Sequence, residues 1–134
     1  MKQLHTLNHQ KPYWINAYPK ETADLISMMI NNNPQACKDD VIPQGYGEFG
    51  LTATNPIPVY GIPENEDYLS KLRLQNGEKI SWERVGSVSA ENINEPIDKY
   101  LIQNRKGEKI TYLYISPYHL NTSKKAPKGF KILR

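Results

Sequence analysis

Three side chains in the second half of the sequence could carry acid–base chemistry: Arg84, Asp98 and His119. Successive side chains of a strand point to opposite faces, and this alternation places Arg84 and Asp98 on one face of two neighbouring predicted strands. There the arginine could orient an anion while the carboxylate accepts a proton, beside tyrosine hydroxyls. The alternative, which we favour, is a structural ion pair that holds the sheet together.

His119 follows the last predicted strand, directly after Tyr118. Its ordinary pKa of about 6.5 suits proton transfer near neutral pH. Together with the arginine and the aspartate it would make a small hydrolase or transferase. A structural role at the end of the strand is the interpretation that we favour.

The remaining histidines and the single cysteine do not form a recognisable site. His5 and His9 are four residues apart, which would suit a metal ion only if this part of the chain were helical. Cys37 lies in a polar stretch with no histidine near it in the sequence. We therefore predict no metal site and no cofactor, and we treat Cys37 as incidental.

Residues 45–61, GYGEFGLTATNPIPVYG, are dense in glycine, proline and aromatic side chains. That composition excludes a helix and predicts a long, fixed loop that leads into a sheet. Loops on rigid scaffolds commonly carry binding sites. The candidate ligand-binding residues belong to this loop and to the end of the last strand: Tyr46, Phe49, Asn55, Tyr60, Tyr114 and Tyr118.

The leading functional hypothesis is a non-enzymatic binding or interaction module. Its surface would be formed by residues 45–63 together with Tyr118 and His119. The partner would be another protein or a small ligand. The sequence contains no nucleophile elbow, P-loop, dinucleotide fingerprint or zinc pattern that would favour an enzyme of a familiar class.

Charge is unevenly distributed along the chain. Residues 99–134 contain nine Lys or Arg and one acid, a balance of +8, whereas residues 1–98 contain eight bases and thirteen acids, a balance of −5. A basic segment predicts an anionic partner such as nucleic acid, and base stacking would need Tyr112, Tyr114 or Tyr118 at the surface. Lysines that protect strand edges would give the same composition. Nucleic-acid binding ranks third, because the register predicted below buries Tyr112 and Tyr114.

The length of the chain indicates one domain. The expected segments are an N-terminal arm at 1–19, a helix at 20–32, a long loop at 34–67, a β-meander at 68–118 and a basic tail at 119–134. Leu25, Met28 and Met29 form the apolar stripe of the helix, which Ile26 and Ile30 extend.

Two turns that contain glycine predict β-hairpins in the second half. The segments LQNGEKISW and IQNRKGEKITY each place an apolar run before the turn and an alternating run after it. Three-residue turns predict these pairs: Leu72 with Ile80, Ile102 with Ile110, Tyr100 with Tyr112, and Asp98 with Tyr114. The predicted strands are about 68–74, 78–89, 97–104 and 109–116, although residues 63–74 could instead form a helix.

These elements predict an α+β fold. It consists of an antiparallel β-meander of four or more strands, with one N-terminal helix packed on it and a long Gly/Pro-rich loop. The tail could add a short strand at residues 130–133.

Several motifs resemble a small bacterial domain family of uncharacterised function: TNPIPV at 54–59, R-x-GS at 84–87, PYH at 117–119 and APKGF at 126–130. The resemblance covers roughly residues 45–130 and implies a compact single domain in bacteria. It implies no activity, catalytic residue or cofactor. No apolar run approaches the roughly 20 residues of a membrane span, and the start lacks the apolar block of a secretion signal. We therefore expect a cytoplasmic protein without a membrane partner.

Overall fold

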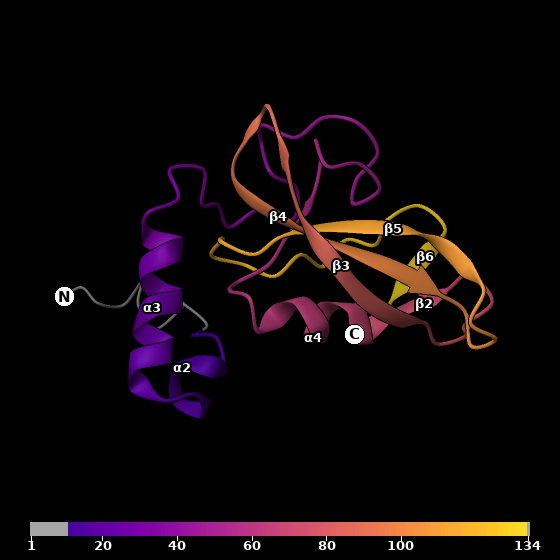
Figure 1. The fold of residues 1–134 in the computed structure, drawn as a ribbon, viewed down its shortest axis with the longest axis horizontal. Helices are drawn as coiled ribbons and strands as arrows, with labels where there is room; N and C mark the ends of the chain where they lie inside the picture. The colour runs from indigo at the N-terminus through magenta and orange to yellow at the C-terminus, as the bar shows by residue number, and fades with distance from the viewer. Residues whose placement is uncertain (1–10, 134) are drawn as a thin grey trace.

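A computed structural model describes residues 11–133 and has an α+β fold (Figure 1). The three described helices are α2 (Trp14–Ala17), α3 (Lys20–Asn31) and α4 (Glu64–Lys71). The strands are β1 (Ile57–Pro58), β2 (Leu72–Leu74), β3 (Ser81–Ala90), β4 (Ile93–Gln103), β5 (Lys109–Ser116) and β6 (Phe130–Ile132). No helix within residues 11–133 is long and apolar enough to cross a membrane.

The main sheet has four strands in the order β1-β5-β4-β3. β3, β4 and β5 form an antiparallel meander, and β1 adds to the edge of β5 in the parallel direction. The sheet is therefore mixed, and the prediction of a purely antiparallel four-stranded meander is wrong in this detail. A strand of two residues that pairs with a strand more than fifty residues later leaves no periodicity in the sequence.

The first predicted hairpin is present only next to its turn, where Arg73 pairs with Lys79 in the predicted register. This pair is an isolated bridge, and β2 does not join the main sheet. The ladder of β2 is formed with β6 of the tail, where Leu72 lies opposite Ile132, and the predicted pair of Leu72 with Ile80 does not extend the isolated bridge into a ladder. Residues 64–71, which the strand prediction favoured as part of a strand from 68 to 74, form α4 instead. Acids in the first turn of this helix and a lysine in the last turn match the helix dipole.

The register of the β4–β5 hairpin differs by one residue from the prediction. Ile102 pairs with Thr111 and Tyr100 with Leu113, because the ladder is irregular between Ile102 and Gln103. A shift of one residue turns every side chain of a strand to the opposite face. Leu113 therefore lies in the core, and the aromatic side of β5 faces away from it.

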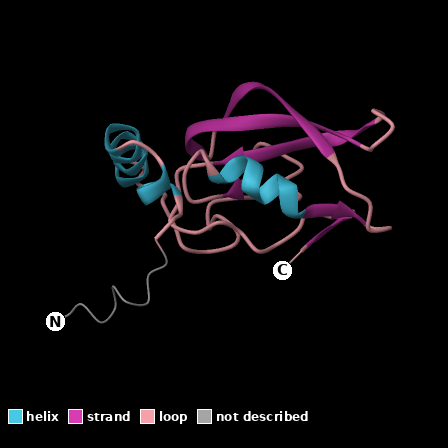
Figure 2. Cartoon of the chain, turned by 90° about the horizontal axis from the view of Figure 1, so that it is seen from below, coloured by secondary structure: helices cyan, strands magenta, loops and turns pink. Residues whose placement is uncertain are grey.

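α4 covers one face of the sheet, which we call the inner face (Figure 2). Tyr68, Leu69 and Leu72 pack there against Ile102 and Leu113, and all five are almost completely buried. Burying a side chain of this size contributes roughly 1.5–3 kcal/mol. The layer of helix on sheet that the sequence predicts is present, but a different helix forms it.

α3 matches the predicted helix at 20–32 in position but lies beside the sheet and not on it (Figure 1). It packs on α2 and buries Ile26 and Ile30 around Trp14. Leu25 and Met28 of the predicted stripe are 53% and 51% exposed. The prediction identified the helix correctly but selected the wrong face, because both faces offer apolar residues.

The long loop between α3 and β1 covers part of the other face of the sheet, the outer face (Figure 1). Ile42 packs there against Ile93 and Ile97. The amide of Asn92 donates to the carbonyl oxygens of Gln44 and Thr54 at 2.9 and 2.7 Å, which fixes the loop to the turn between β3 and β4. The loop is thus fixed on the sheet, as its composition predicts.

Candidate functional site

Arg84 and Asp98 form the ion pair that the sequence predicts. Nη2 and Nε of Arg84 donate to Oδ1 of Asp98 at 2.8 and 3.2 Å. The other carboxylate oxygen accepts from the amide of Asn65, at 2.8 Å. The Asp98 side chain is 12% exposed and that of Arg84 is 50% exposed, so the pair reaches from the core to the surface.

The polar side chains around this pair are buried, and most of their polar atoms form hydrogen bonds. The Asn65 amide also donates to the hydroxyl of Tyr100 at 3.2 Å, while its own buried oxygen has no hydrogen-bond partner within the described chain. Burial raises the pKa values of Tyr100 and Tyr118, and the nearby charge of Asp98 raises them further. Asp98 has donors on both oxygens, an arrangement typical of a structural carboxylate. The expected neighbour Tyr114 lies on the outer face, opposite Lys99.

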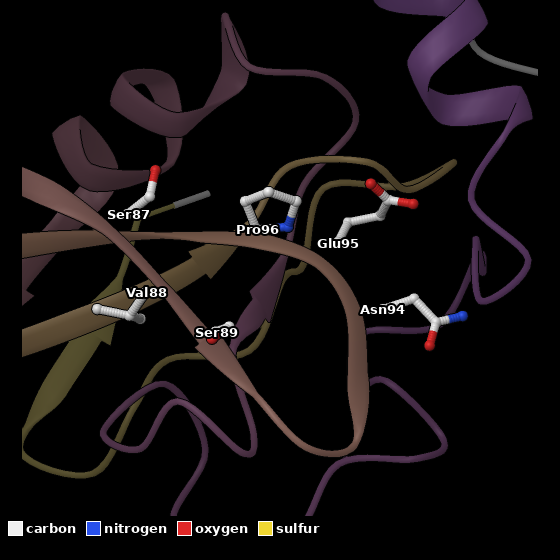
Figure 3. A pocket seen from close by; sticks show the side chains of 6 residues that line it. All are labelled: Ser87, Val88, Ser89, Asn94, Glu95 and Pro96. Carbon is white, nitrogen blue, oxygen red and sulfur yellow. The ribbon is translucent and has the colours of Figure 1, made fainter.

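A shallow recess of about 340 Å³ lies next to the pair, between the arms of the β3–β4 hairpin (Figure 3). Its lining residues are Ser87, Val88, Ser89, Asn94, Glu95 and Pro96. Ser87 connects it to the pair, because Nη2 of Arg84 donates to its hydroxyl at 2.9 Å. The recess is open to solvent, and within residues 11–133 no hydrogen bond joins the hydroxyl of Ser87 or Ser89 to a histidine or a carboxylate.

His119 is buried, and both ring nitrogens have partners. Nδ1 accepts the backbone N–H of Cys37 at 3.1 Å, so Nε2 carries the ring proton and donates it to Oγ of Ser116 at 3.0 Å. Burial lowers the pKa of His119 to about 4, so the ring is neutral near pH 7. In this tautomer the imidazole cannot accept a proton from the serine. Within the described residues no hydrogen bond joins His119 to Arg84 or Asp98, and the three catalytic candidates do not form one connected set.

Cys37 contributes its backbone to this arrangement and not its thiol. Burial raises the pKa of the thiol, so the thiolate is disfavoured. The described residues contain no group of three or more His, Cys, Asp or Glu placed to hold a metal ion. His5 and His9 lie outside the described residues.

The candidate binding residues at the start of the loop serve different purposes. Tyr46 is 51% exposed, and its hydroxyl donates to Glu91 at 2.5 Å. Phe49 belongs to the core under the sheet. Asn55 is buried and donates to the carbonyl oxygen of Gly47 at 2.8 Å. None of these three residues lines the recess or the larger cavity described below.

Tyr60, at the end of the loop, lines a cavity of about 1310 Å³ that the sequence did not indicate. The other lining residues come from several distant segments: Lys11, Pro12, Tyr13, Lys38, Glu64, Asp67, Tyr68, Ser70, Lys71, Leu120, Asn121, Thr122, Ser123, Lys124, Ile132 and Leu133. Tyr118 pairs with Tyr60 through a β-bridge, but Tyr118 and His119 are buried and neither lines the cavity. Of the predicted surface of residues 45–63, Tyr118 and His119, only Tyr60 lines this cavity, and residues 120–124 line it where Tyr118 and His119 were expected.

The wall of this cavity holds a half-buried carboxylate among lysines. The hydroxyl of Thr122 donates to Glu64 and accepts the backbone N–H of Tyr60 at 3.0 Å. Burial raises the pKa of Glu64, and the Thr122 hydrogen bond opposes this effect. Burial and the Glu64 charge also raise the pKa of Tyr60. Lysine ammonium groups and tyrosine rings at one hollow suit a polar anionic ligand.

Sequence reasoning missed α4 and residues 120–124 as parts of a site. The residues of the cavity share no motif, since each segment contributes only one to five of them. The one available signal was the acidic start and basic end of residues 64–71, which indicates the helix.

Comparison with protein-family models, with curated proteins and with solved structures found no match for the chain.

Proposed function

We propose that this protein is a non-enzymatic binding module whose cavity beside α4 takes a polar anionic ligand. One observation carries the proposal: lysines 11, 38, 71 and 124, together with Tyr13 and Tyr60, line one hollow of about 1310 Å³. Cavities of this order accommodate small organic molecules, and a few polar groups fix their orientation. The acids Glu64 and Asp67 of the same wall leave the lining with a positive balance, four bases against two acids.

The geometry supports catalysis less well. A hydrolase or transferase would need His119, Arg84 and Asp98 to meet at one reacting group. His119 is engaged on both nitrogens, and Arg84 is engaged with Asp98 and Ser87. The cavity lining also includes neither Arg84 nor His119.

The ligand would be a metabolite with a carboxylate or phosphate group, or an acidic side chain of a partner protein. We place the module, as part of the proposal, in the cytoplasm of a bacterium, on the sequence expectations alone.

The proposal is tested by amide-resolved NMR titration with a panel of simple carboxylates, inorganic phosphate and nucleotides. Binding at the cavity shifts the amides of Tyr60, Lys71 and Thr122 together. The double variant Lys71→Gln/Lys124→Gln should lose most of the affinity, whereas Lys20→Gln, on α3 and away from the cavity, should keep it. Binding that persists in the double variant, or shifts confined to other regions, would contradict the proposal.

A further inference from the structure

A second surface is created by the unexpected register of β5. On the outer face, Lys99 pairs with Tyr114 and Leu101 with Tyr112. All four side chains are partly exposed. The long loop packs on this face around Ile97, where Tyr114 lies against the cluster, whereas Tyr112 lies outside it. We call Lys99, Leu101, Lys109, Tyr112 and Tyr114 the tyrosine face.

Two lysines contact the rings of this face. Nζ of Lys99 lies 4.2 Å from the ring centroid of Tyr112 and 5.8 Å from that of Tyr114. Nζ of Lys109 lies 4.1 Å from the Tyr112 centroid. Neither ammonium group forms an ion pair or a hydrogen bond among the interactions recorded for residues 11–133. Their positive charges therefore remain available to an anionic partner.

The rings of Tyr112 and Tyr114 are far enough apart for each to stack on a different base. Tyr112 and Tyr114 are two residues apart on one strand, so their Cα atoms are about 7 Å apart along it. That distance is about twice the 3.4 Å rise between stacked bases in one strand of a duplex. A single strand with splayed bases could place one base on each ring, whereas a duplex keeps its base faces inside the stack.

We propose that the tyrosine face binds single-stranded nucleic acid. The phenol rings stack on bases, and Lys99 and Lys109 leave their ring contacts to bind the neighbouring phosphates. This site is separate from the cavity beside α4, whose lining shares none of these residues. Electrostatic attraction also comes from the wider segment of residues 99–134, with its balance of nine bases to one acid.

The tail lysines are not required by the proposal. Lys125 lies over the ring of Phe49 at 5.7 Å, and Lys128 is 4.0 Å from a carboxylate oxygen of Glu48. Both partners belong to the loop that covers the sheet, so part of the basic tail is engaged elsewhere. The basic composition predicts nucleic-acid binding through residues 99–134 as a whole, whereas the present proposal assigns it to the strand pair of β4 and β5.

Fluorescence anisotropy with labelled 12-mers of thymidylate and of uridylate, single-stranded and as duplexes, tests the proposal. We expect single strands to bind more tightly than duplexes of the same length. Tyr112→Ala should weaken binding about tenfold, and Tyr112→Phe, which keeps the ring, should bind like the natural protein. The variant Lys99→Gln/Lys109→Gln should flatten the plot of log K against log salt by about 1.4.

Tyr18→Ala and Lys131→Gln are the matched controls, because Tyr18 is exposed on another part of the fold and Lys131 is an exposed lysine of β6. Melting curves confirm that each variant is folded. Equal affinity for duplexes, or equal loss with Tyr112→Phe and Tyr112→Ala, would overturn the proposal. So would binding of polyglutamate with the same dependence on the two lysines but none on the rings, which would indicate an acidic protein partner. Absence of binding at low salt would also overturn it.

Discussion

Nε2 of His119 donates to Oγ of Ser116 across 3.0 Å, in a site that solvent does not reach. The pair connects the end of β5 to the segment that follows it, and Nδ1 connects the same ring to the backbone of Cys37. A serine beside a histidine suggests a nucleophile, but here the proton runs from the imidazole to the hydroxyl. The ring is a structural connector, and its protonation would cost stability.

The buried imidazole of His119 predicts a specific pH dependence of the free energy of unfolding. The pKa of His119 falls from 6.5 to about 4 on folding, so the unfolded chain binds more protons between these values. The free energy of unfolding therefore includes a contribution from neutral His119 that is complete above about pH 6.5. This contribution is lost as the pH falls toward 4, and the total loss is roughly 3 kcal/mol. Urea unfolding between pH 4 and pH 7 measures it.

His119→Asn is the comparison variant, since its side-chain oxygen can still accept the Cys37 N–H. The variant should be less stable at pH 7 but should lose about 3 kcal/mol less than the natural protein between pH 7 and pH 4. His5 and His9 are present in both proteins and cancel in the comparison. Parallel pH profiles of the two proteins would show that His119 does not titrate as described.

The Arg84–Asp98 pair gives a second prediction. Asp98→Ala removes the carboxylate that accepts from Asn65 and Arg84, which are buried and half-buried. It should lower the free energy of unfolding by about 2–3 kcal/mol. Arg84→Ala should cost about 1–2 kcal/mol, because half of that side chain is in water. A double-mutant cycle by urea unfolding should give a coupling of about 1 kcal/mol or more. Strict additivity would mean that the contact contributes nothing of its own.

Gly61 gives a third prediction. Its φ is +96°, and a Cβ atom there would lie 2.8 Å from the ring of Trp14, which is completely buried. Gly61→Ala should therefore cost about 3 kcal/mol or more through backbone strain and the displacement of α2. Gly77→Ala is the matched control, because φ is +89° but no atom lies within 4 Å of its added Cβ. The control should cost about 1 kcal/mol, and equal melting temperatures of the two variants would contradict the explanation.

Local chemistry made part of this fold predictable. The helix at 20–31, the second hairpin and the Arg84–Asp98 pair follow from side-chain spacing within short segments. The face of α3 was mispredicted because its partner, α2, is a single turn around Trp14 with no period to detect. The sequence pattern favoured the sheet as the nearest apolar surface.

The register and the cavity depend on features that are not local. The irregularity next to Gln103 decides which side of β5 is buried, and no residue type there marks it. β2 forms its ladder with β6 across more than fifty residues, whereas its own sequence indicated only the nearer turn, at which Arg73 bridges Lys79. The cavity joins segments from Lys11 to Leu133, and only their packing brings them together.

Glu64 provides a prediction that connects stability with the proposed ligand. Burial raises the pKa of its carboxyl, so its negative charge destabilises the fold as the pH rises. Glu64→Gln keeps an oxygen that accepts the Thr122 hydroxyl and removes the charge. Stability at pH 7 should be unchanged or slightly higher, and the affinity for an anionic ligand of the cavity should rise severalfold, because repulsion is removed.

The two results are measured separately, by thermal melting and by isothermal titration with the anion found in the NMR panel. Ser70→Ala, a change in the same cavity wall without a change of charge, is the control and should leave the affinity nearly unaltered. A ligand that binds Glu64→Gln more weakly than the natural protein uses the carboxylate as an acceptor. The cavity would then favour a cationic group, and the assignment of an anionic ligand would be wrong.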